Sequence, residues 1–269
     1  MRSLAGLALL TCLGVVHGAE APPITDRYPR AADAYVVAIG ATDRWSRAAD
    51  RSLPPASLTK LMTAVVLLES EWDPDRWVTV SAQAARATGA RAGLAEREQI
   101  TAGDLLAALL VRSANDACIA LAEHHAGSVA AFVARMNERS ATLALNRTQF
   151  TNPCGLDAPG HHSSANDLLR LARHAVKFPS VAALAAARSI TISTRKGRQI
   201  PLATTNPLLG RLDGAIGLKS GYTAGAGPCV VVHARREDID VWVVLLNARD
   251  RWWTAAALVE DAFHVARHD

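Results

Sequence analysis

Three short segments of this chain carry side chains that could together perform nucleophilic catalysis. They are Ser57-Leu-Thr-Lys60, Ser113-Ala-Asn115 and Lys219-Ser-Gly221. A serine hydroxyl becomes a good nucleophile when a neighbouring base removes its proton, and a lysine can be that base if burial lowers its pKa. Each segment alone is a weak signal, because an S-x-x-K pattern is expected about once in a chain of this length.

The first segment lies where a buried helix is predicted to begin. Pro54-Pro55 ends the preceding stretch, and a three-residue spacing places Ser57 and Lys60 on one face of the helix, one turn apart. The backbone N–H of Ser57 can then help to bind a developing oxyanion at the helix N-terminus. The apolar residues that predict the helix are Leu58, Leu61, Met62, Val65, Val66 and Leu68.

Two rival matches have simpler explanations. Ser193-Thr-Arg-Lys196 runs into a Gly-containing polar stretch and is predicted to form a solvated hairpin turn. Ser164-Ala-Asn166 is explained by Ser164 capping the helix that follows.

Lysine usage supports the first and third segments. Among 29 lysines and arginines, the only lysines are Lys60, Lys177, Lys196 and Lys219, so two of the four occupy motif positions. Arginine cannot give up its proton at working pH, whereas a buried lysine can. The pattern indicates a chemical need for an amine at both positions.

These groups define a mechanism. Neutral Lys60 takes the proton of Ser57, whose oxygen attacks a peptide carbonyl and forms an acyl-enzyme. The positive charge of Lys219, if close, keeps Lys60 unprotonated. Ser113 relays a proton to the departing amine, and Asn115 bonds the substrate backbone.

The third segment is predicted to be a strand along the substrate. Lys219 and Ser220 then face the terminal carboxylate of the substrate, and Gly221 allows close backbone approach.

The elements around these segments predict an α+β fold. Strands near both ends of the chain enclose a helical middle, so we expect an antiparallel sheet flanked by helices. A helical lobe is expected to be inserted at about residues 81–187, with the site in the cleft between the two lobes. A polar turn is expected at Thr42-Asp43, and a helical block over 101–144 is expected to start at a Thr101/Asp104 capping box. The predicted strands are 35–39, 189–194, 215–220, 229–234 and 239–247, and further helices are predicted over 164–176 and 252–267.

The N-terminus and the charge indicate the compartment. Arg2, the apolar run 4–16 and small residues at Gly18 and Ala21 predict a signal peptide over residues 1–21, so that 22–269 forms one exported catalytic domain, periplasmic or secreted. The net charge of +4 is mild and no basic tail is present, so no nucleic-acid partner is expected.

The cysteines and histidines predict no metal site or cofactor. Cys12 lies in the predicted signal peptide, and its removal leaves an odd set of three, Cys118, Cys154 and Cys229, that matches no zinc spacing. Cys118 is expected to be core packing, while Cys154 and Cys229 could pair, which the sequence leaves undecided. The adjacent pairs His124-His125 and His161-His162 lack a ligand spacing and are expected in solvated or capping roles.

Longer stretches around the motifs resemble the low-molecular-mass penicillin-binding proteins of the D-alanyl-D-alanine carboxypeptidase family. The resemblance is carried by Pro55-Ala-Ser-Leu-Thr-Lys-Leu-Met-Thr63, Ser113-Ala-Asn-Asp-Ala117, Thr148-Gln-Phe-Thr-Asn-Pro-Cys-Gly-Leu-Asp157, Thr205-Asn-Pro-Leu-Leu209 and Gly217-Leu-Lys-Ser-Gly-Tyr-Thr223. It implies a β-lactamase/transpeptidase-like fold, peptidoglycan stem peptides as substrates and β-lactam antibiotics as covalent inhibitors.

The resemblance also implies roles for individual residues. Ser57, Lys60, Ser113 and Asn115 would be catalytic. The substrate-binding residues would be Lys219, Ser220, Gly221 and Tyr222, the last giving its backbone N–H as second oxyanion donor.

Several features depart from the family pattern. Ser220 replaces the commoner threonine, and Cys154 stands where histidine or another residue is expected. No C-terminal β domain or membrane anchor is expected after the last helix, in which Trp253, Leu258 and Phe263 are predicted to be core.

Three alternatives to a carboxypeptidase remain open. An endopeptidase that cuts D-alanyl cross-links would use the same groups. A β-lactamase would be slow, because no glutamate occurs between Glu138 and Glu237 to activate a deacylating water. A catalytically silent penicillin-binding module is the third.

Overall fold

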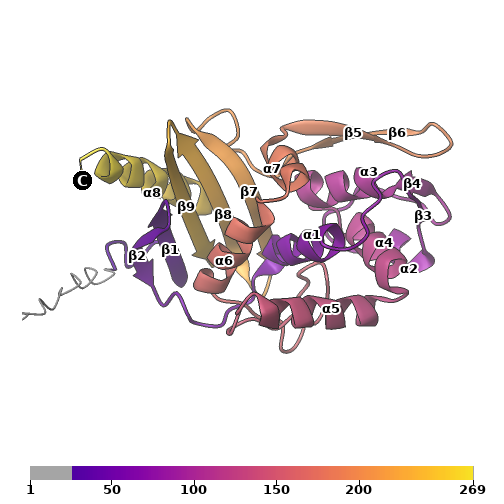
Figure 1. Cartoon of the computed structure of the whole chain (residues 1–269), viewed down its shortest axis with the longest axis horizontal. Coiled ribbons are helices and arrows are strands. Elements are labelled where there is room, and N and C mark those ends of the chain that lie inside the picture. The colour runs from indigo at the N-terminus through magenta and orange to yellow at the C-terminus, as the bar shows by residue number, and fades with distance from the viewer. Residues whose placement is uncertain (1–25, 269) are drawn as a thin grey trace, which may run out of the picture.

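The computed structural model describes residues 26–268, which form a five-stranded antiparallel sheet and a helical lobe beside it (Figure 1). The strand order is β2-β1-β9-β8-β7, so the N-terminal hairpin adds to the three C-terminal strands. The predicted signal peptide lies outside the described residues. The strands of this sheet are β1 (Ala34–Ile39), β2 (Thr42–Arg47), β7 (Ala215–Thr223), β8 (Gly227–Arg236) and β9 (Ile239–Leu246).

Alternating residues of the central strands bury both faces of the sheet. Val36, Val231 and Val244 belong to the core shared with the helical lobe. Val37 and Val243 face the opposite side, where α8 (Arg251–Ala266) covers the sheet. The period of two in these strands explains why they are almost wholly apolar: each side chain meets a hydrophobic layer.

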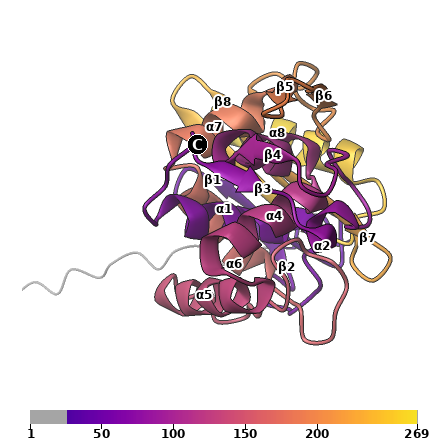
Figure 2. The same cartoon turned by 90° about the vertical axis from the view of Figure 1, so that its right-hand side faces the viewer.

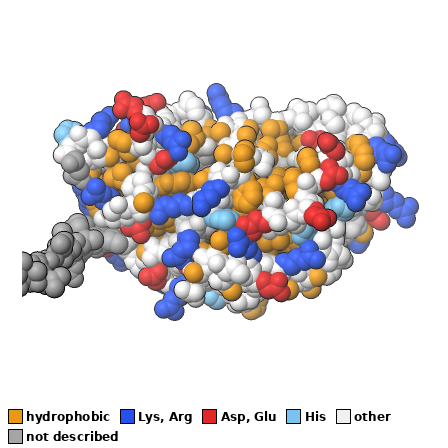
Figure 3. Space-filling model, in the orientation of Figure 1, with side chains coloured by type: hydrophobic (Ala, Val, Ile, Leu, Met, Phe, Trp, Pro, Cys, Tyr) orange, Lys and Arg blue, Asp and Glu red, His pale blue; other side chains and the backbone are white. Residues whose placement is uncertain are grey.

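The helical lobe contains two small hairpins besides its helices. The β5–β6 hairpin and α5 lie at opposite edges of the molecule in both views (Figures 1 and 2). Charged side chains of both signs are interspersed with apolar ones over the face in Figure 3. The remaining elements are η1 (Ala56–Thr59), α1 (Lys60–Leu68), β3 (Trp77–Thr79), α2 (Ala82–Ala85), β4 (Gln99–Thr101), α3 (Ala102–Ala107), the π-helix η2 (Ala108–Arg112), α4 (Asn115–Ala126), α5 (Val129–Thr142), α6 (Ala165–Ala175), α7 (Pro179–Ala186), β5 (Ser189–Ser193) and β6 (Gln199–Ala203).

The prediction of a sheet assembled from both ends of the chain is confirmed, with one strand differently placed. The predicted strand 189–194 forms β5, which pairs only with β6 in a separate hairpin. The polar turn predicted at Thr42-Asp43 is wrong, because Gly40 at φ +57° turns the chain earlier and both residues already belong to β2.

The predicted helical block 101–144 is divided into α3, η2, α4 and α5. Thr101 Oγ1 does accept from the Asp104 N–H at the start of α3, but the Asp104 carboxylate accepts from the Ser193 N–H of β5, so the capping box is only half formed. The Ser164 cap of α6 is confirmed by its bond from the Asp167 N–H.

The closing helix contains one error of prediction. Leu258 and Phe263 are buried against the sheet, as expected, whereas Trp253 is 83% exposed. Trp253 lies in the first turn of α8, on the side away from the sheet, so helical periodicity alone did not place it. Within 26–268 no single helix has the length and hydropathy to cross a bilayer, although the bent pair α4 and α5 meets those criteria by length and composition alone.

Candidate active site

Ser57 lies in a tight turn that the surrounding backbone holds in place. The predicted helix begins as the 3-10 segment η1, and only from Lys60 does it continue as α1. Ala56 takes the left-handed conformation, with φ +48°, which turns the chain into η1. Gly155 packs beneath this turn, and a side chain at 155 would overlap the Ala56 carbonyl oxygen.

The Lys60 amine is fully buried and lies among three oxygen atoms. Its Nζ is 3.1 Å from Ser57 Oγ, 2.7 Å from Asn115 Oδ1 and 2.6 Å from the main-chain oxygen of Cys154. The three-residue spacing of Ser57 and Lys60 does place them on one face, as the sequence predicted.

The pKa of Lys60 lies well below its ordinary value. Burial is the largest cause, because it penalises the charged amine, and the positive charge of Lys219 adds to it while Asp116 opposes both. Burial also lowers the pKa of Lys219, to about 7, with a smaller contribution from Arg251. Burial therefore favours the neutral form of the Lys60 amine, as a general base requires.

Ser113 occupies the break between η2 and α4. Its left-handed backbone, φ +63°, ends the π-helix and turns its side chain toward β7, where Lys219 Nζ lies 2.8 Å from Ser113 Oγ. Both residues are nearly inaccessible, at 5% and 2% exposure. The second and third motifs therefore meet through this hydrogen bond, a contact that the sequence did not specify.

Asn115 begins α4 and connects the lysine to the loop that precedes β4. Its side-chain amide donates to the Thr88 carbonyl at 2.6 Å, and its backbone N–H donates to the Ala90 carbonyl at 2.8 Å. The Asn115 amide oxygen thereby faces Lys60 in a fixed direction.

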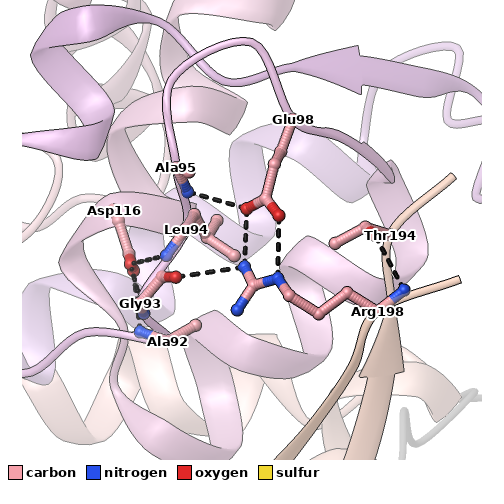
Figure 4. A network of polar contacts seen from close by, with 8 residues as sticks. All are labelled: Ala92, Gly93, Leu94, Ala95, Glu98, Asp116, Thr194 and Arg198. Atoms are coloured by element: carbon pink, nitrogen blue, oxygen red, sulfur yellow. Dashed lines mark hydrogen bonds and ion pairs between the residues drawn. The ribbon is translucent and has the colours of Figure 1, made fainter. Parts of the chain in front are cut away.

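The neighbouring Asp116 holds the same loop from the other side (Figure 4). Its carboxylate accepts the backbone N–H groups of Ala92, Gly93 and Leu94 at 2.9–3.1 Å. Arg198 of the β5–β6 hairpin bonds both the Gly93 carbonyl and the Glu98 carboxylate, so the hairpin is tied to this loop.

Strand β7 passes directly beside the nucleophile. A methyl group at Gly221 would lie 2.7 Å from the Ser57 backbone nitrogen, so only glycine allows this approach. Ser220 Oγ lies 3.0 Å from Thr205 Oγ1, and the Arg251 guanidinium donates to the Gly221 carbonyl. The Tyr222 side chain is 66% exposed, which leaves its backbone as the part that can serve the site.

The structure corrects the expected roles of the cysteines. Cys118 is not simple packing: it forms a disulfide with Cys154, with Cα atoms 6.0 Å apart. Cys229 is buried and has no disulfide partner among residues 26–268. The pairing of Cys154 with Cys229 that the sequence left open is therefore excluded. Cys118 lies one turn after Asn115 on α4, which brings its sulfur to the 152–156 loop.

His161 is also not solvated or a helix cap, as had been expected. Its side chain is only 5% exposed. The ring nitrogen Nδ1 accepts a hydrogen bond from the Thr151 N–H at 3.0 Å. The proton of the neutral ring is therefore on Nε2, which donates to Thr59 Oγ1 at 2.8 Å. Thr59 in turn donates to the Ala56 carbonyl at 2.9 Å. Burial lowers the pKa of His161 to about 4, so it supports the nucleophile turn as a neutral ring. A cavity of about 370 Å³ opens beside this turn.

The Lys60 amine joins Ser57 and Asn115, and a separate hydrogen bond joins Ser113 to Lys219. Strand β7 carries Lys219, Ser220, Gly221 and Tyr222, and brings Gly221 against the Ser57 nitrogen. Sequence reasoning did not identify four groups: the Cys154 carbonyl, Asp116, Thr205 and Arg251. The first three lie inside stretches that carried the family resemblance, which was the available signal. Among residues 26–268 no cluster of three potential metal ligands occurs.

Comparisons with known proteins identify relatives of this chain. Residues 24–250 match the family model described as D-alanyl-D-alanine carboxypeptidase. The chain is 30% identical over 208 residues to the D-alanyl-D-alanine carboxypeptidase DacF of Bacillus subtilis, covering 76% of this chain and 54% of that protein. It is 31% identical over 208 residues to the D-alanyl-D-alanine endopeptidase of Escherichia coli, covering 76% and 66%. It spans about half the length of the curated carboxypeptidases it matches.

The fold has a close match among solved structures. The DD-transpeptidase of Streptomyces K15 superposes with a TM-score of 0.83 at 26% identity, over 90% of this chain and 98% of that one. The expected transpeptidase-like α+β fold is thereby confirmed. Because the family model spans every motif from Ser57 to Tyr222, the chain belongs to the D-alanyl-D-alanine carboxypeptidase family of serine peptidases.

Proposed function

We propose that this chain is a serine-type D-alanyl-D-alanine carboxypeptidase that trims peptidoglycan stem peptides through an acyl-enzyme on Ser57. The observation that carries the proposal is the buried amine of Lys60, which lies 3.1 Å from Ser57 Oγ and whose pKa burial holds well below its ordinary value. A neutral amine beside a serine hydroxyl is a base that needs no further activation.

The surroundings of Lys60 also orient that base. A neutral amine has two hydrogens and one lone pair, and two of its three neighbours, Asn115 Oδ1 and the Cys154 carbonyl, can only accept. Once both hydrogens are donated to these acceptors, the lone pair faces Ser57 Oγ. Ser57 then donates its proton to Lys60 as its oxygen attacks the penultimate D-alanine carbonyl.

The oxyanion that develops is assigned to two backbone N–H groups, those of Ser57 and Tyr222. The close approach of Gly221 to the Ser57 nitrogen supports this assignment, because it brings the two donors to the same side of the nucleophile. One well-placed donor contributes about 10²–10³ in rate.

The departing D-alanine needs a proton on its amine. Ser113 is suited to deliver it, since its hydroxyl accepts a hydrogen bond from the Lys219 amine at 2.8 Å. Lys219 and Ser220 would bind the terminal carboxylate of the substrate, which explains the need for a buried cation at this point.

β-Lactam antibiotics should acylate Ser57 by the same route and leave slowly. The stretch between Glu138 and Glu237 contains no glutamate that could activate a water as in class A β-lactamases.

The same centre could serve an endopeptidase that cuts cross-links. This alternative is supported by the 31% identity to the D-alanyl-D-alanine endopeptidase of Escherichia coli, and the two activities need the same catalytic groups. Export, periplasmic or secreted, is proposed from the signal-peptide pattern of residues 1–21 and from the location of cell-wall substrates.

The deciding experiment supplies purified protein with a muropeptide ending in D-Ala-D-Ala and with a cross-linked muropeptide dimer, and reads the products by mass spectrometry. We expect release of one alanine from the monomer, abolished by Ser57→Ala. Cleavage of the dimer alone would make the enzyme an endopeptidase. Absence of both, together with no labelling of Ser57 by fluorescent penicillin, would make the chain a silent binding module.

A further inference from the structure

The Cys118–Cys154 disulfide joins the two segments that supply acceptors to the Lys60 amine. Asn115, whose Oδ1 is 2.7 Å from Lys60 Nζ, lies one turn before Cys118 on α4. Cys154 itself supplies the other acceptor, its main-chain oxygen at 2.6 Å. The two cysteines are 36 residues apart in sequence, so the covalent bond ties together segments that the chain does not otherwise connect closely.

The loop that carries the Cys154 carbonyl is held together mainly by hydrogen bonds to the Asn152 side chain. The Asn152 Oδ1 atom accepts the backbone N–H groups of Cys154, Gly155 and Leu156 at 2.8–3.2 Å. These bonds shape the loop but do not fix it to the helices. Thr63 of α1 binds the Pro153 carbonyl at 2.6 Å on one side, and the disulfide binds the loop to α4 on the other.

We propose that the Cys118–Cys154 disulfide is a positioning element for catalysis, which holds the Cys154 carbonyl and the Asn115 amide oxygen so that the lone pair of Lys60 faces Ser57. This inference rests on the proposed function, because it takes Lys60 as the base. The sulfur atoms touch no reacting atom and act only through the two acceptors.

The role makes acylation dependent on the redox state of this bond. A dithiol reductant gives two electrons to the disulfide and is itself oxidised to a disulfide, while Cys118 and Cys154 become thiols that each take a proton. The loop then keeps its bonds to α1, from Thr63 to the Pro153 carbonyl and from Lys60 to the Cys154 carbonyl, but loses its covalent link to α4. The second acceptor of Lys60 is then no longer covalently fixed relative to the first.

Two effects on the reaction follow. The acylation rate falls about tenfold to a hundredfold, because a shift of about 1 Å in a catalytic group costs on that order. Water that reaches the loosened amine lessens the effect of burial, so the pKa of Lys60 rises and the acid limb of the pH profile moves to higher pH. Penicillin binding before acylation is unchanged, because both cysteine side chains are buried, at 0% and 1% exposure, and present no surface to a ligand.

The test compares the double variant Cys118→Ala/Cys154→Ala with the matched control Cys229→Ala, in which a free buried cysteine is removed. Alanine at 154 keeps the main-chain carbonyl, so only its tether is lost. A non-reducing digest read by mass spectrometry first checks that Cys118 and Cys154 are linked in the wild type. Acylation by fluorescent penicillin is then measured against concentration, to separate binding from the chemical step, and against pH, with and without a dithiol reductant.

We expect the double variant to bind penicillin as the wild type does but to acylate slowly, with the acid limb of its pH profile at higher pH. Reductant should slow acylation and move the acid limb in the same way in the wild type and in Cys229→Ala. Reductant should leave the double variant unchanged. Should the double variant fail to fold, the reductant comparison between the wild type and Cys229→Ala decides alone.

The positioning role is overturned if the digest finds no disulfide between Cys118 and Cys154. It is also overturned if breaking this disulfide changes thermal stability but leaves the acylation rate and the acid limb of the pH profile at their wild-type values. Ser57→Ala separates this outcome from failure of the proposed function: if wild-type labelling does not depend on Ser57, the proposed function itself is wrong.

Discussion

Lys219 Nζ lies 2.8 Å from Ser113 Oγ, although 106 residues separate them in sequence. The contact is formed because the left-handed backbone of Ser113 turns its hydroxyl out of the helical lobe and toward β7. A buried ammonium group next to a hydroxyl favours the alkoxide character needed for passing a proton on.

Replacing this hydroxyl should impair turnover and leave the fold intact. We expect Ser113→Ala to lower kcat for a D-Ala-D-Ala peptide by about 10²–10⁴, the range for a lost proton-transfer group. Ser140→Ala is the matched control, because Ser140 is equally buried and its hydroxyl has no hydrogen-bond partner within the described part of the chain. Equal kcat values for the two variants, measured by alanine release, would remove Ser113 from the proton path.

The charge of Lys219 should also set the pH at which Lys60 becomes active. Acylation needs neutral Lys60, so its rate rises with pH through the Lys60 pKa, which burial and the Lys219 charge hold below the ordinary value. Removing a nearby positive charge raises that pKa. We therefore expect Lys219→Gln to move the acid limb of penicillin acylation to higher pH, in addition to weakening binding.

The measurement is the acylation rate at saturating penicillin, normalised to its plateau at high pH. Lys177→Gln provides the control, since Lys177 lies at the end of α6 and takes no part in the site. An acid limb that stays in place in Lys219→Gln would mean that burial alone sets the pKa of Lys60.

The sequence predicted the side chains of this site far better than its supporting backbone. Ser57, Lys60, Ser113 and Lys219 are specified by their functional groups, and their spacing on a helix or strand follows from local geometry. The Cys154 carbonyl could not be found in this way, because every residue carries one and only the fold decides where it points.

Other misses have the same origin in tertiary contacts. The pairing of Cys118 with Cys154 depends on how α4 meets the 152–156 loop, and three cysteines leave several pairings open. The burial of His161 and the exposure of Trp253 oppose their usual tendencies, and each is decided by which neighbour covers the position. The sheet was predictable because its strands alternate between two apolar layers.

Gly221 should be required for its small size. Its backbone needs no left-handed conformation, yet an added methyl would lie 2.7 Å from the Ser57 nitrogen and 2.9 Å from Ala56 Cβ, so β7 or η1 must shift. Such a shift moves the oxyanion donors. We expect Gly221→Ala to lower acylation of Ser57 by about 10²-fold or more, as loss of one oxyanion donor does.

Gly225→Ala is the control for this substitution. An added methyl there meets the end of the Asp157 side chain, which can move. Stopped-flow labelling with a chromogenic β-lactam, alongside circular dichroism, measures both variants. A folded Gly221→Ala protein that acylates at the wild-type rate would show that the approach of β7 to Ser57 has no catalytic role.

His161 should make stability fall as the solution is acidified. In the unfolded chain its pKa is about 6.5, whereas burial lowers it to about 4 in the folded protein. Between these values the unfolded state binds more protons, so the free energy of unfolding decreases as pH falls from 6.5 to 4 and levels off below. The loss attributable to this residue is at most about 3 kcal/mol, from about 1.4 kcal/mol for each pKa unit.

Carboxylates also contribute to acid unfolding, so the effect of His161 has to be isolated by comparing variants. His161→Gln removes the titrating ring and should lower stability at pH 7 by about 1–2 kcal/mol, because hydrogen bonds to Thr59 and Thr151 are weakened. Its disadvantage relative to the wild type should then shrink as the solution is acidified and reverse near pH 4, because the wild-type loss of up to about 3 kcal/mol exceeds the initial deficit. His162→Gln, at the neighbouring and less buried histidine, should keep the wild-type slope.

Urea unfolding at pH 7, 5.5 and 4 measures these slopes. If His161→Gln and the wild type lose stability in parallel over this range, His161 does not titrate between the two pKa values. His161 would then bind protons equally in the folded and unfolded states, so its protonation would not change the free energy of unfolding. In that case the contacts that His161 makes through Thr59 to the Ala56 carbonyl would not require a neutral ring.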